Sequence, residues 1–479
     1  MALLAIDQGT TGTTCLVVDE ELRPLGRAYR EIRQRYPQPG WVEHDPEELW
    51  QSVLGAAEEA LAAAGLNASA LTAVGITNQR ETTLLWERRN GRPIGRAIVW
   101  QDRRTADRCR ELPADLVRAR TGLVCDPYFS ATKLEWVLAR TKLPQSELAF
   151  GTVDSWLVWK LTDGRVHATD ETNASRTLLL DISSREWDDE LLALFGVERT
   201  LLPRVVTSSE VVAEVDLLGA TVPLAGIAGD QQAALFGQAC FEPGEAKVTY
   251  GTGSFVLVNS GGAPGPPPEG LLETVAARPA GGDPVYALEG AVLVAGAALQ
   301  WLRDALGLIG AAAESEAQAR SVKSSEGVVF VPALTGLGSP YWDADARGLV
   351  TGLTRGTTKA HLVRAALEAI ALQVADIVAA VPGGVRLLRA DGGAAANGFL
   401  MQLQADLLGA PVEVSADVEA TALGAAALAG LAVGTWRGPA DVVPLLRRGG
   451  RGYEPAGDAA GLEALRAAWK LAVRRTTLR

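Results

Sequence analysis

The chain has 479 residues, of which 48% are hydrophobic and 21% are charged. This length exceeds that of one compact domain, since domains commonly hold roughly 100–200 residues. The composition is that of a globular protein and excludes a chain that is disordered throughout. The formal net charge of −12 argues against a nucleic-acid partner, because proteins that bind nucleic acids usually carry a basic field.

The cysteines, the histidines and the lengths of the apolar runs exclude further classes of protein. The four cysteines form no C-x-x-C pair, and the three histidines form no cluster, so we expect reduced thiols and no zinc hydrolase. The first residues lack the basic flank of a signal peptide, and the longest apolar run, residues 291–302, is too short to span a bilayer. The sequence therefore predicts a cytoplasmic protein without stable membrane insertion.

The first half of the chain alternates strands and helices. We predict strands at residues 2–6, 15–18, 71–77 and 222–228, and a helix that begins at Pro46 and ends near Gly65. Asp163-Gly164 predicts a hairpin turn between residues 156–161 and Val166.

The second half shows the same alternation. Strands are expected at residues 247–250, 255–259 and 385–390, and helices at residues 358–380, 394–408 and 421–433. The last of these helices is rich in small residues, so we expect it to pack closely against a neighbour. The recurring mixture of strands and helices predicts an α/β fold.

One unit occurs twice. A strand, a Gly-Thr turn and a second strand appear near Thr10 and again near Thr252. Two copies of one supersecondary unit predict two similar domains that face each other across a cleft. We place the boundary at Phe241-Glu242-Pro243-Gly244, which gives domains 1–240 and 241–479.

The two Gly-Thr turns predict phosphate binding. Glycine lets backbone N–H groups approach an anion, and an aspartate on the same turn can hold Mg²⁺. Asp7 with Thr10 and Thr11 matches this pattern, and Thr252 with Gly253 supplies a second turn. A plain hairpin is the alternative for either turn alone. No G-x-x-x-x-G-K-[ST] sequence is present, so a P-loop fold is not expected.

Polar residues at other strand ends form a second group of candidates. Asp230 ends a strand and could accept a proton from an attacking hydroxyl, although a helix N-cap is an alternative. Arg80-Glu81 offers a donor beside an acceptor, which suits a polyol, although a surface ion pair is an alternative. Gly393, in Asp391-Gly392-Gly393, could approach a nucleotide or belong to a plain turn.

In combination, these motifs resemble the glycerol kinases of the FGGY carbohydrate kinase family. The resemblance runs from residue 3 to about residue 436. Its motifs are Asp7-Gln8-Gly9-Thr10-Thr11, Gly40-Trp41-Val42-Glu43-His44-Asp45-Pro46, Asn78-Gln79-Arg80-Glu81-Thr82, Asp126-Pro127-Tyr128-Phe129-Ser130, Gly226-Ile227-Ala228-Gly229-Asp230-Gln231-Gln232, Tyr250-Gly251-Thr252-Gly253 and Asp391-Gly392-Gly393.

The resemblance implies two actin-like, ribonuclease-H-like domains with ATP between them. It also implies transfer of the γ-phosphoryl of Mg-ATP to a terminal hydroxyl of glycerol, giving sn-glycerol 3-phosphate and ADP, by a homo-oligomer. By the same resemblance, Asp230 is the general base, the glycerol hydroxyls bind to Arg80, Glu81, Tyr128 and Gln231, and the glycerol carbons pack against Trp100 and Phe255. The phosphates are expected to contact Thr10, Thr11, Gly12 and Thr252. The nucleotide site is expected to be lined by Gly296, Gln300, Gly393 and Asn397, and Mg²⁺ to be held by Asp7.

Two departures and two alternatives accompany the resemblance. The family often has Ser-Ser-Arg where this chain has Gly12-Thr13-Thr14, and Cys where it has Ser254. A kinase of another polyol or ketose is one alternative, although pentulose kinases usually carry Gln-Met-His-Gly in place of Gln79-Arg80-Glu81-Thr82. The other is a non-catalytic binding module switched by a nucleotide. Taken apart from the motifs, the three aromatic residues of this set would be assigned to the core; they are Trp100, Tyr128 and Phe255.

Overall fold

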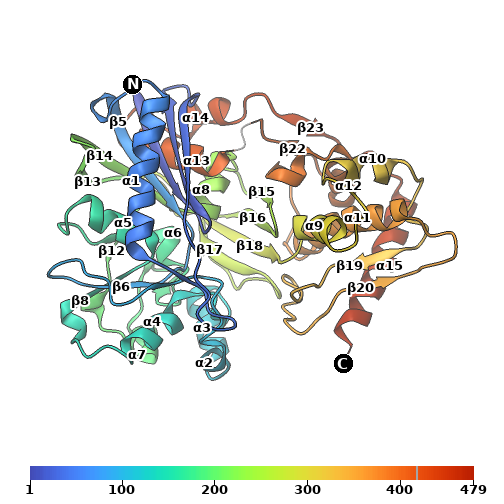
Figure 1. Cartoon of the computed structure of the whole chain (residues 1–479), viewed down its shortest axis with the longest axis horizontal. Coiled ribbons are helices and arrows are strands. Elements are labelled where there is room, and N and C mark those ends of the chain that lie inside the picture. Colours follow the sequence, from blue (N-terminus) through green and yellow to red (C-terminus); the bar gives the residue numbers. More distant parts are fainter. Residues whose placement is uncertain (417–418, 479) are drawn as a thin grey trace.

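The computed structural model describes residues 1–416 and 419–478, which form two lobes, each built on a mixed β-sheet (Figure 1). The sheet of the first lobe has the order β13 (Ser209–Leu217), β14 (Ala220–Gly229), β5 (Leu71–Asn78), β1 (Ala2–Gln8), β2 (Gly12–Asp19), β3 (Pro24–Glu31). That of the second lobe has the order β17 (Leu272–Val275), β18 (Tyr286–Val292), β16 (Ser254–Gly261), β15 (Glu245–Tyr250), β21 (Leu387–Asp391), β22 (Val412–Val414), β23 (Arg451–Tyr453).

The pairing of the strands shows that the predicted repeat is real. In the first lobe, β1 is antiparallel to β2 and parallel to β5, and β2 is antiparallel to β3. In the second lobe, β15 is antiparallel to β16 and parallel to β21, and β16 is antiparallel to β18. The α/β class and the duplicated unit are therefore confirmed.

The period-two alternation of β1 builds a core on each face of the first sheet. Leu4 and Ile6 pack in one buried cluster with residues of α1 (Pro46–Ala63). Leu3 and Ala5 pack in another with residues of α13 (Ala420–Ala432). Successive strand residues point to opposite faces, so an apolar strand that is covered on both sides carries no polar alternation.

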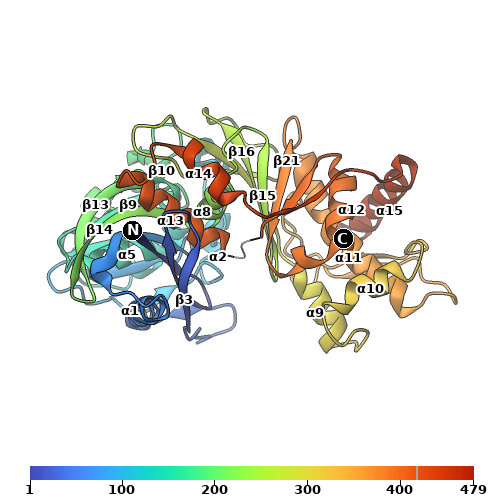
Figure 2. The ribbon, with the colours of Figure 1, turned by 90° about the horizontal axis from the view of Figure 1, so that it is seen from above.

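Helix α13 joins the first lobe although it follows the second sheet in the sequence. It packs against β14, β5 and β1 and against α8 (Asp230–Gly237), and the views from the front and from above show it beside the N-terminal strands (Figures 1 and 2). Val442 and Leu446 of α14 (Pro439–Leu446) belong to the same core. The C-terminal part of the chain thus contributes to both lobes, and the boundary at residue 240 stays a prediction.

Glycines allow α13 to approach α8 closely, as its small residues predicted. A Cβ atom on Gly424 would lie 1.9 Å from the carbonyl oxygen of Ala233, and one on Gly237 would lie 1.9 Å from that of Ala420. The backbones of the two helices are therefore in direct contact, and no side chain fits between them at these positions.

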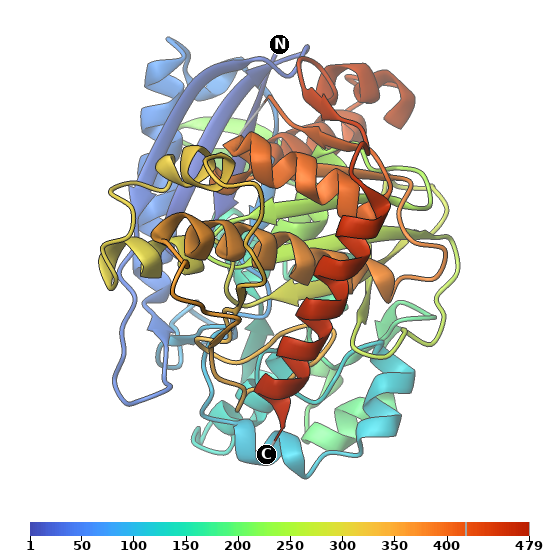
Figure 3. The same ribbon diagram turned by 90° about the vertical axis from the view of Figure 1, so that its right-hand side faces the viewer.

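The remaining elements complete the lobes. Between β5 and β13 lie β6 (Leu84–Glu87), β7 (Ala97–Ile98), α2 (Ala106–Arg110), α3 (Ala114–Thr121), α4 (Ser130–Leu138), β8 (Leu148–Gly151), α5 (Val153–Leu161), β9 (Ala168–Asp170), α6 (Glu171–Ala174), β10 (Leu180–Asp181), β11 (Glu186–Trp187), α7 (Asp189–Phe195) and β12 (Arg204–Val206), and β4 (Glu43–His44) precedes α1. The second lobe adds α9 (Gly296–Asp304), α10 (Glu314–Arg320), β19 (Val329–Val331), β20 (Leu349–Thr351), α11 (Lys359–Ala379), α12 (Gly398–Leu408) and α15 (Ala459–Thr477), which runs along its outer side (Figure 3). Within the described ranges, no helix has the length and apolar character needed to cross a membrane.

The predicted hairpin at Asp163-Gly164 is wrong on its first arm. Residues 156–161 belong to helix α5, not to a strand. Every residue of α5 except Lys160 is buried, so the helix lacks the polar stripe that produces a helical period in sequence. Its aromatic and apolar composition then favoured a strand.

The contact between α13 and α8 yields a stability prediction. We expect Gly424→Ala to lower the free energy of unfolding by roughly 1–3 kcal/mol, because the new methyl group must displace a backbone carbonyl. Gly452→Ala is the control, since a Cβ there has no neighbour within 4 Å, and it should change stability by less than about 0.5 kcal/mol. Urea unfolding followed by tryptophan fluorescence measures both. Equal midpoints for the two variants would contradict the close packing.

Candidate active site

Three predicted site residues lie at or just after the ends of neighbouring parallel strands. Asp7 lies near the end of β1, Arg80 follows β5, and Asp230 follows β14. These strands are adjacent and in register, with Asp7 paired to Thr77 and Gly229 paired to Asn78. Since parallel strands end at the same edge of a sheet, the fold brings the three side chains to one place.

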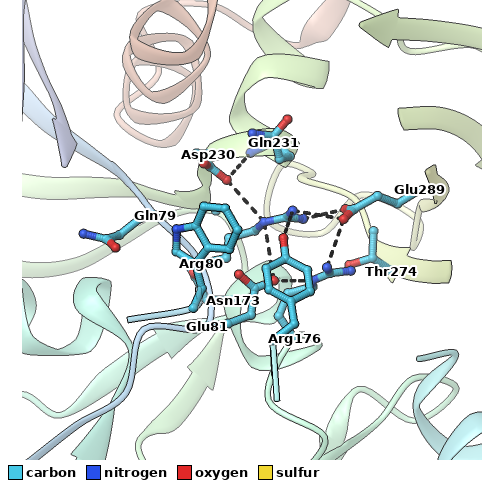
Figure 4. Close-up of polar contacts among 12 residues, drawn as sticks. Gln79, Arg80, Glu81, Asn173, Arg176, Asp230, Gln231, Thr274 and Glu289 are labelled. Carbon is cyan, nitrogen blue, oxygen red and sulfur yellow. Dashed lines mark hydrogen bonds and ion pairs between the residues drawn. The ribbon is translucent and has the colours of Figure 1, made fainter. Parts of the chain in front are cut away.

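The guanidinium of Arg80 is the centre of this site (Figure 4). Its Nε atom lies 3.2 Å from Oδ1 of Asp230, and its Nη2 donates to the hydroxyl of Tyr128 at 3.2 Å. Its Nη1 donates to Oε2 of Glu289 at 2.6 Å, across the boundary between the lobes. Only 2% of the Arg80 side chain is exposed. The alternative of a surface ion pair for Arg80-Glu81 is therefore wrong.

Glu81 is held in an unusual conformation beside Arg80. Its φ angle of 61° lies in the left-handed region, where a residue with a side chain is strained. Its carbonyl oxygen accepts from Oγ of Ser130 at 3.0 Å, and its carboxylate accepts from Nε of Arg176 at 2.7 Å. Burial raises the pKa of Glu81, while Arg80 and Arg176 oppose that rise. Both the backbone and the side chain of Glu81 are thus fixed by neighbours.

Asp230 is more accessible than its neighbours. It is the first residue of α8, the N-cap of that helix is Gly229, and 31% of the Asp230 side chain is exposed. The alternative of an N-cap role is therefore wrong. A carboxylate that is held by Arg80 and still reaches solvent is placed to meet a bound hydroxyl group.

The next residue, Gln231, contacts a lysine that the sequence analysis did not single out. Nζ of Lys247 donates to Oε1 of Gln231 and, at 3.2 Å, to Oγ1 of Thr249. Burial lowers the pKa of Lys247 to about 8, although Asp391 and Asp230 favour its charged form. A second cation therefore lies close to Asp230.

The predicted aromatic residues form one cluster between the lobes. The ring of Trp100 lies 5.4 Å from that of Tyr128 and 6.5 Å from that of Phe255, centroid to centroid, with edge-to-face geometry. Phe255 belongs to β16 of the second lobe. All three rings are partly exposed, which contradicts the alternative of core residues and leaves an apolar surface beside Arg80.

The first phosphate turn is tied to this cluster. Nε1 of Trp100 donates to Oγ1 of Thr10 at 2.9 Å, and the carbonyl oxygen of Thr11 accepts from the amide of Ile32. A Cβ on Gly12 would lie 2.5 Å from the ring and hydroxyl of Tyr29, so Tyr29 covers this glycine directly. Tyr29 also pairs across the sheet with Thr14, where the family often has arginine.

The second phosphate turn packs against the start of α9. The carbonyl oxygen of Thr252 accepts from the amides of Ala295 and Ala297, and that of Gly251 accepts from Gly296 at 3.0 Å. A Cβ on Gly296 would lie 2.6 Å from the oxygen of Gly251, so only glycine permits this approach. Gly296 and the Thr252 turn are therefore brought together.

The remaining predicted nucleotide residues lie in a turn after β21, on α9 and at the start of α12. Gly393 follows Gly392, whose φ is 87° and which lies against the end of β15. Gln300 is exposed on α9. Asn397 caps α12, since its Oδ1 accepts from the amide of Leu400 at 3.0 Å and its Nδ2 donates to Ser315. The side chain of Asn397 is thus engaged within the second lobe.

The carboxyl group of Asp7 is buried near two other acidic side chains. Burial, together with the negative charges of Asp230 and Glu419, raises its pKa to about 8. A bound cation would relieve this repulsion. Residues 1–416 and 419–478 contain no cluster of three or more histidine, cysteine, aspartate or glutamate side chains that could enclose a metal.

Sequence reasoning missed three buried charges in the site: Arg176, Lys247 and Glu289. Two of them carried a usable signal. Glu289 is the only charged residue of β18, and Lys247 lies within β15, and both strands are otherwise mostly apolar and buried. Charged residues are rarely fully buried without partners, so each marks a specific electrostatic contact. Arg176 lies in a loop after α6, where sequence gave no such signal.

Two family models match the chain. The N-terminal domain of the FGGY family of carbohydrate kinases matches residues 2–237, and the C-terminal domain matches residues 246–433. Two curated relatives named glycerol kinase are similar over nearly their whole length: that of Leptothrix cholodnii is 56% identical, covering 99% of both chains, and that of Aromatoleum aromaticum is 57% identical, covering 99% of this chain and 98% of the relative.

Solved structures agree with this assignment. Plasmodium falciparum glycerol kinase with ADP superposes with a TM-score of 0.95 at 35% identity, covering 100% of this chain and 98% of that one. A xylulose kinase from Brucella ovis superposes with a TM-score of 0.86 at 28% identity, covering 99% and 98%. The chain belongs to the FGGY family of carbohydrate kinases.

Proposed function

We propose that this chain transfers the γ-phosphoryl group of ATP to a terminal hydroxyl of glycerol, giving sn-glycerol 3-phosphate and ADP. The glycerol kinases to which it is similar support this acceptor, and the relative solved with ADP supports the nucleotide. The observation that carries the proposal is the junction of Arg80, Glu81 and Asp230 at one sheet edge, where a donor, an acceptor and an accessible carboxylate meet.

The side chains around Arg80 match the chemistry of a small polyol. Each hydroxyl group both donates and accepts a hydrogen bond, and the site offers the guanidinium of Arg80, the carboxylate of Glu81 and the hydroxyl of Tyr128. We assign these groups and Gln231 to the glycerol hydroxyls, and the rings of Trp100 and Phe255 to its carbon chain. A poorer acceptor would leave buried polar groups unpaired, which is costly.

The chemical step needs positioning and one base. A terminal glycerol oxygen attacks the γ-phosphorus, the bond from that phosphorus to the bridging oxygen of ADP breaks, and ADP keeps the electron pair. Asp230 takes the proton of the attacking hydroxyl. Phosphoryl transfer through a loose transition state depends mainly on alignment and on stabilisation of charge, which the Thr10 and Thr252 turns provide through backbone N–H groups and hydroxyls.

We propose the roles of the remaining site residues on the same basis. Thr10, Thr11, Gly12 and Thr252 contact phosphates, and Gly296, Gln300, Gly393 and Asn397 line the nucleotide site. Asp7 holds Mg²⁺, which would neutralise phosphate charge when bound. A homo-oligomer, either a dimer or a tetramer, stays an expectation from the family resemblance, and the cytoplasmic location stays a prediction from the sequence.

The two alternatives make different demands on the site. The xylulose kinase from Brucella ovis shares the fold, so the fold alone does not select the acceptor. Arg80 and Glu81 stand where pentulose kinases usually carry Met and His, which favours glycerol. A non-catalytic module would have no need of an accessible Asp230 beside the polyol residues.

The direct test is release of ADP from Mg-ATP by the purified chain, with glycerol, with pentuloses, with dihydroxyacetone and with no acceptor. We expect strong stimulation by glycerol and weak stimulation by the pentuloses. Stimulation by a pentulose in place of glycerol would transfer the assignment to the alternative acceptor. ATP binding without stimulation by any acceptor would favour the binding module.

Asp230→Asn tests the base. We expect kcat to fall by at least about 100-fold, because an amide cannot take the hydroxyl proton. Nucleotide affinity, measured by calorimetry with ADP, should stay close to that of the unmodified chain. Turnover above a tenth of the original rate would remove Asp230 from this role.

Arg80→Ala tests the polyol site. We expect the KM for glycerol to rise by roughly 100-fold, since charged hydrogen bonds to the substrate are lost, while the KM for ATP changes by less than about threefold. Steady-state kinetics with each substrate varied in turn separates the two constants. An equal rise in both would contradict the assignment of Arg80 to glycerol.

A further inference from the structure

We propose that Glu289 and Arg176 are positioning residues of the acceptor site, through which the second lobe fixes the orientation of Arg80 and Glu81. This inference rests on the proposed function and adds to it two residues that need not touch the substrate. It also gives a role in the acceptor site to β18, which carries none of the predicted site residues.

Glu289 holds Arg80 by two hydrogen bonds. Its Oε2 accepts from Nη1 of Arg80 at 2.6 Å, and its Oε1 accepts from Nη2 at 3.1 Å. Such paired contacts between a carboxylate and a guanidinium fix the plane of the guanidinium as well as its place. Arg80 therefore presents its Nε edge to Asp230 in one defined orientation (Figure 4).

The same carboxylate reaches Glu81 through Arg176. Oε1 of Glu289 accepts from Nη2 of Arg176 at 2.9 Å, and Nε of Arg176 donates to Oε1 of Glu81 at 2.7 Å. The guanidinium of Arg176 also lies over the rings of Tyr128 and Phe129, at 5.5 and 5.1 Å from their centroids. One residue of the second lobe thus holds both the donor and the acceptor that we assign to glycerol.

Burial makes the partners in these contacts difficult to replace. The side chains of Glu289 and Arg176 are 0% exposed, so water cannot replace a lost partner. Burial alone would raise the pKa of Glu289, but Arg176 and Arg80 lower it to about 2, and it stays ionised at neutral pH. Without its charge, the two guanidinium groups would lose their common partner and the fixed geometry that it imposes.

A purely structural role makes a different prediction from a positioning role. If Glu289 only joined the lobes, its loss would lower stability and leave the affinity of the folded protein for glycerol unchanged. If it orients Arg80 and Glu81, the KM for glycerol must rise while that for ATP does not. The separation of these two constants is therefore the decisive readout.

Glu289→Gln, which keeps the shape and removes the charge, is the test. We expect the KM for glycerol to rise roughly 10- to 100-fold and the KM for ATP to change less than about threefold. Glu289→Asp keeps the charge and should recover part of the affinity lost in Glu289→Gln. If the Gln variant does not fold, Glu289→Asp replaces it and should still raise the KM for glycerol above that of the unmodified chain, because the shorter carboxylate cannot keep its contacts with both Arg80 and Arg176. Arg176→Lys keeps its charge but not both contacts, and should raise the KM for glycerol as well.

Glu245→Gln is the matched control. Glu245 is also a buried glutamate between two arginines, with Arg447 at 2.8 Å and Arg386 at 3.4 Å, but it contacts neither Arg80 nor Glu81. It should lower the melting temperature and leave the KM for glycerol within about twofold of the original. The same result for Glu289→Gln would overturn the positioning role.

Failure of the proposed function gives a different result. It would appear in the unmodified chain as an absence of glycerol turnover. The same comparison of KM values is then made with whichever acceptor the unmodified chain does phosphorylate. An unchanged acceptor KM in Glu289→Gln would again overturn the inference.

Discussion

The relative placement of the two lobes depends on four buried charged side chains that must pair with one another. Arg80, Glu81, Arg176 and Glu289 are almost completely buried, and removing one partner from such a group costs about 3–5 kcal/mol. Three of them belong to the first lobe and Glu289 belongs to the second. The group is satisfied only when β18 lies against the loops that follow β5 and α6, so this constraint favours one relative placement of the lobes.

The four buried charges lie beside side chains that are more accessible to solvent. Next to the four buried charges, Asp230 keeps almost a third of its side chain exposed and Trp100, Tyr128 and Phe255 are partly exposed. Rigid charges behind an accessible carboxylate and an apolar surface form the kind of preorganised site that phosphoryl transfer to a small alcohol requires. The close packing of α8 on α13 supports Asp230 from behind, because Asp230 is the first residue of α8.

Sequence was informative where function requires particular residues at particular spacings. The Gly-Thr turns, Arg80-Glu81 and Asp230 all follow predicted strands, and the structure places them at strand ends. Sequence was less informative where distant segments meet. The partners of Glu289 lie 209 and 113 residues away, the crossing of α13 to the first lobe leaves no local pattern, and α5 is too uniformly buried to show a helical period. A lone charge in an otherwise apolar strand, such as Glu289 in β18, was nevertheless a usable sign of a buried electrostatic contact.

A double-mutant cycle between Glu289→Gln and Arg176→Met tests the central claim, that both residues act on the acceptor through one connected group. The measured quantity is the KM for glycerol in the four proteins of the cycle. The account predicts strong non-additivity, with the double variant little worse than the poorer single variant, because each change alone already breaks the connection to Glu81. Independent effects that multiply in the double variant would contradict it.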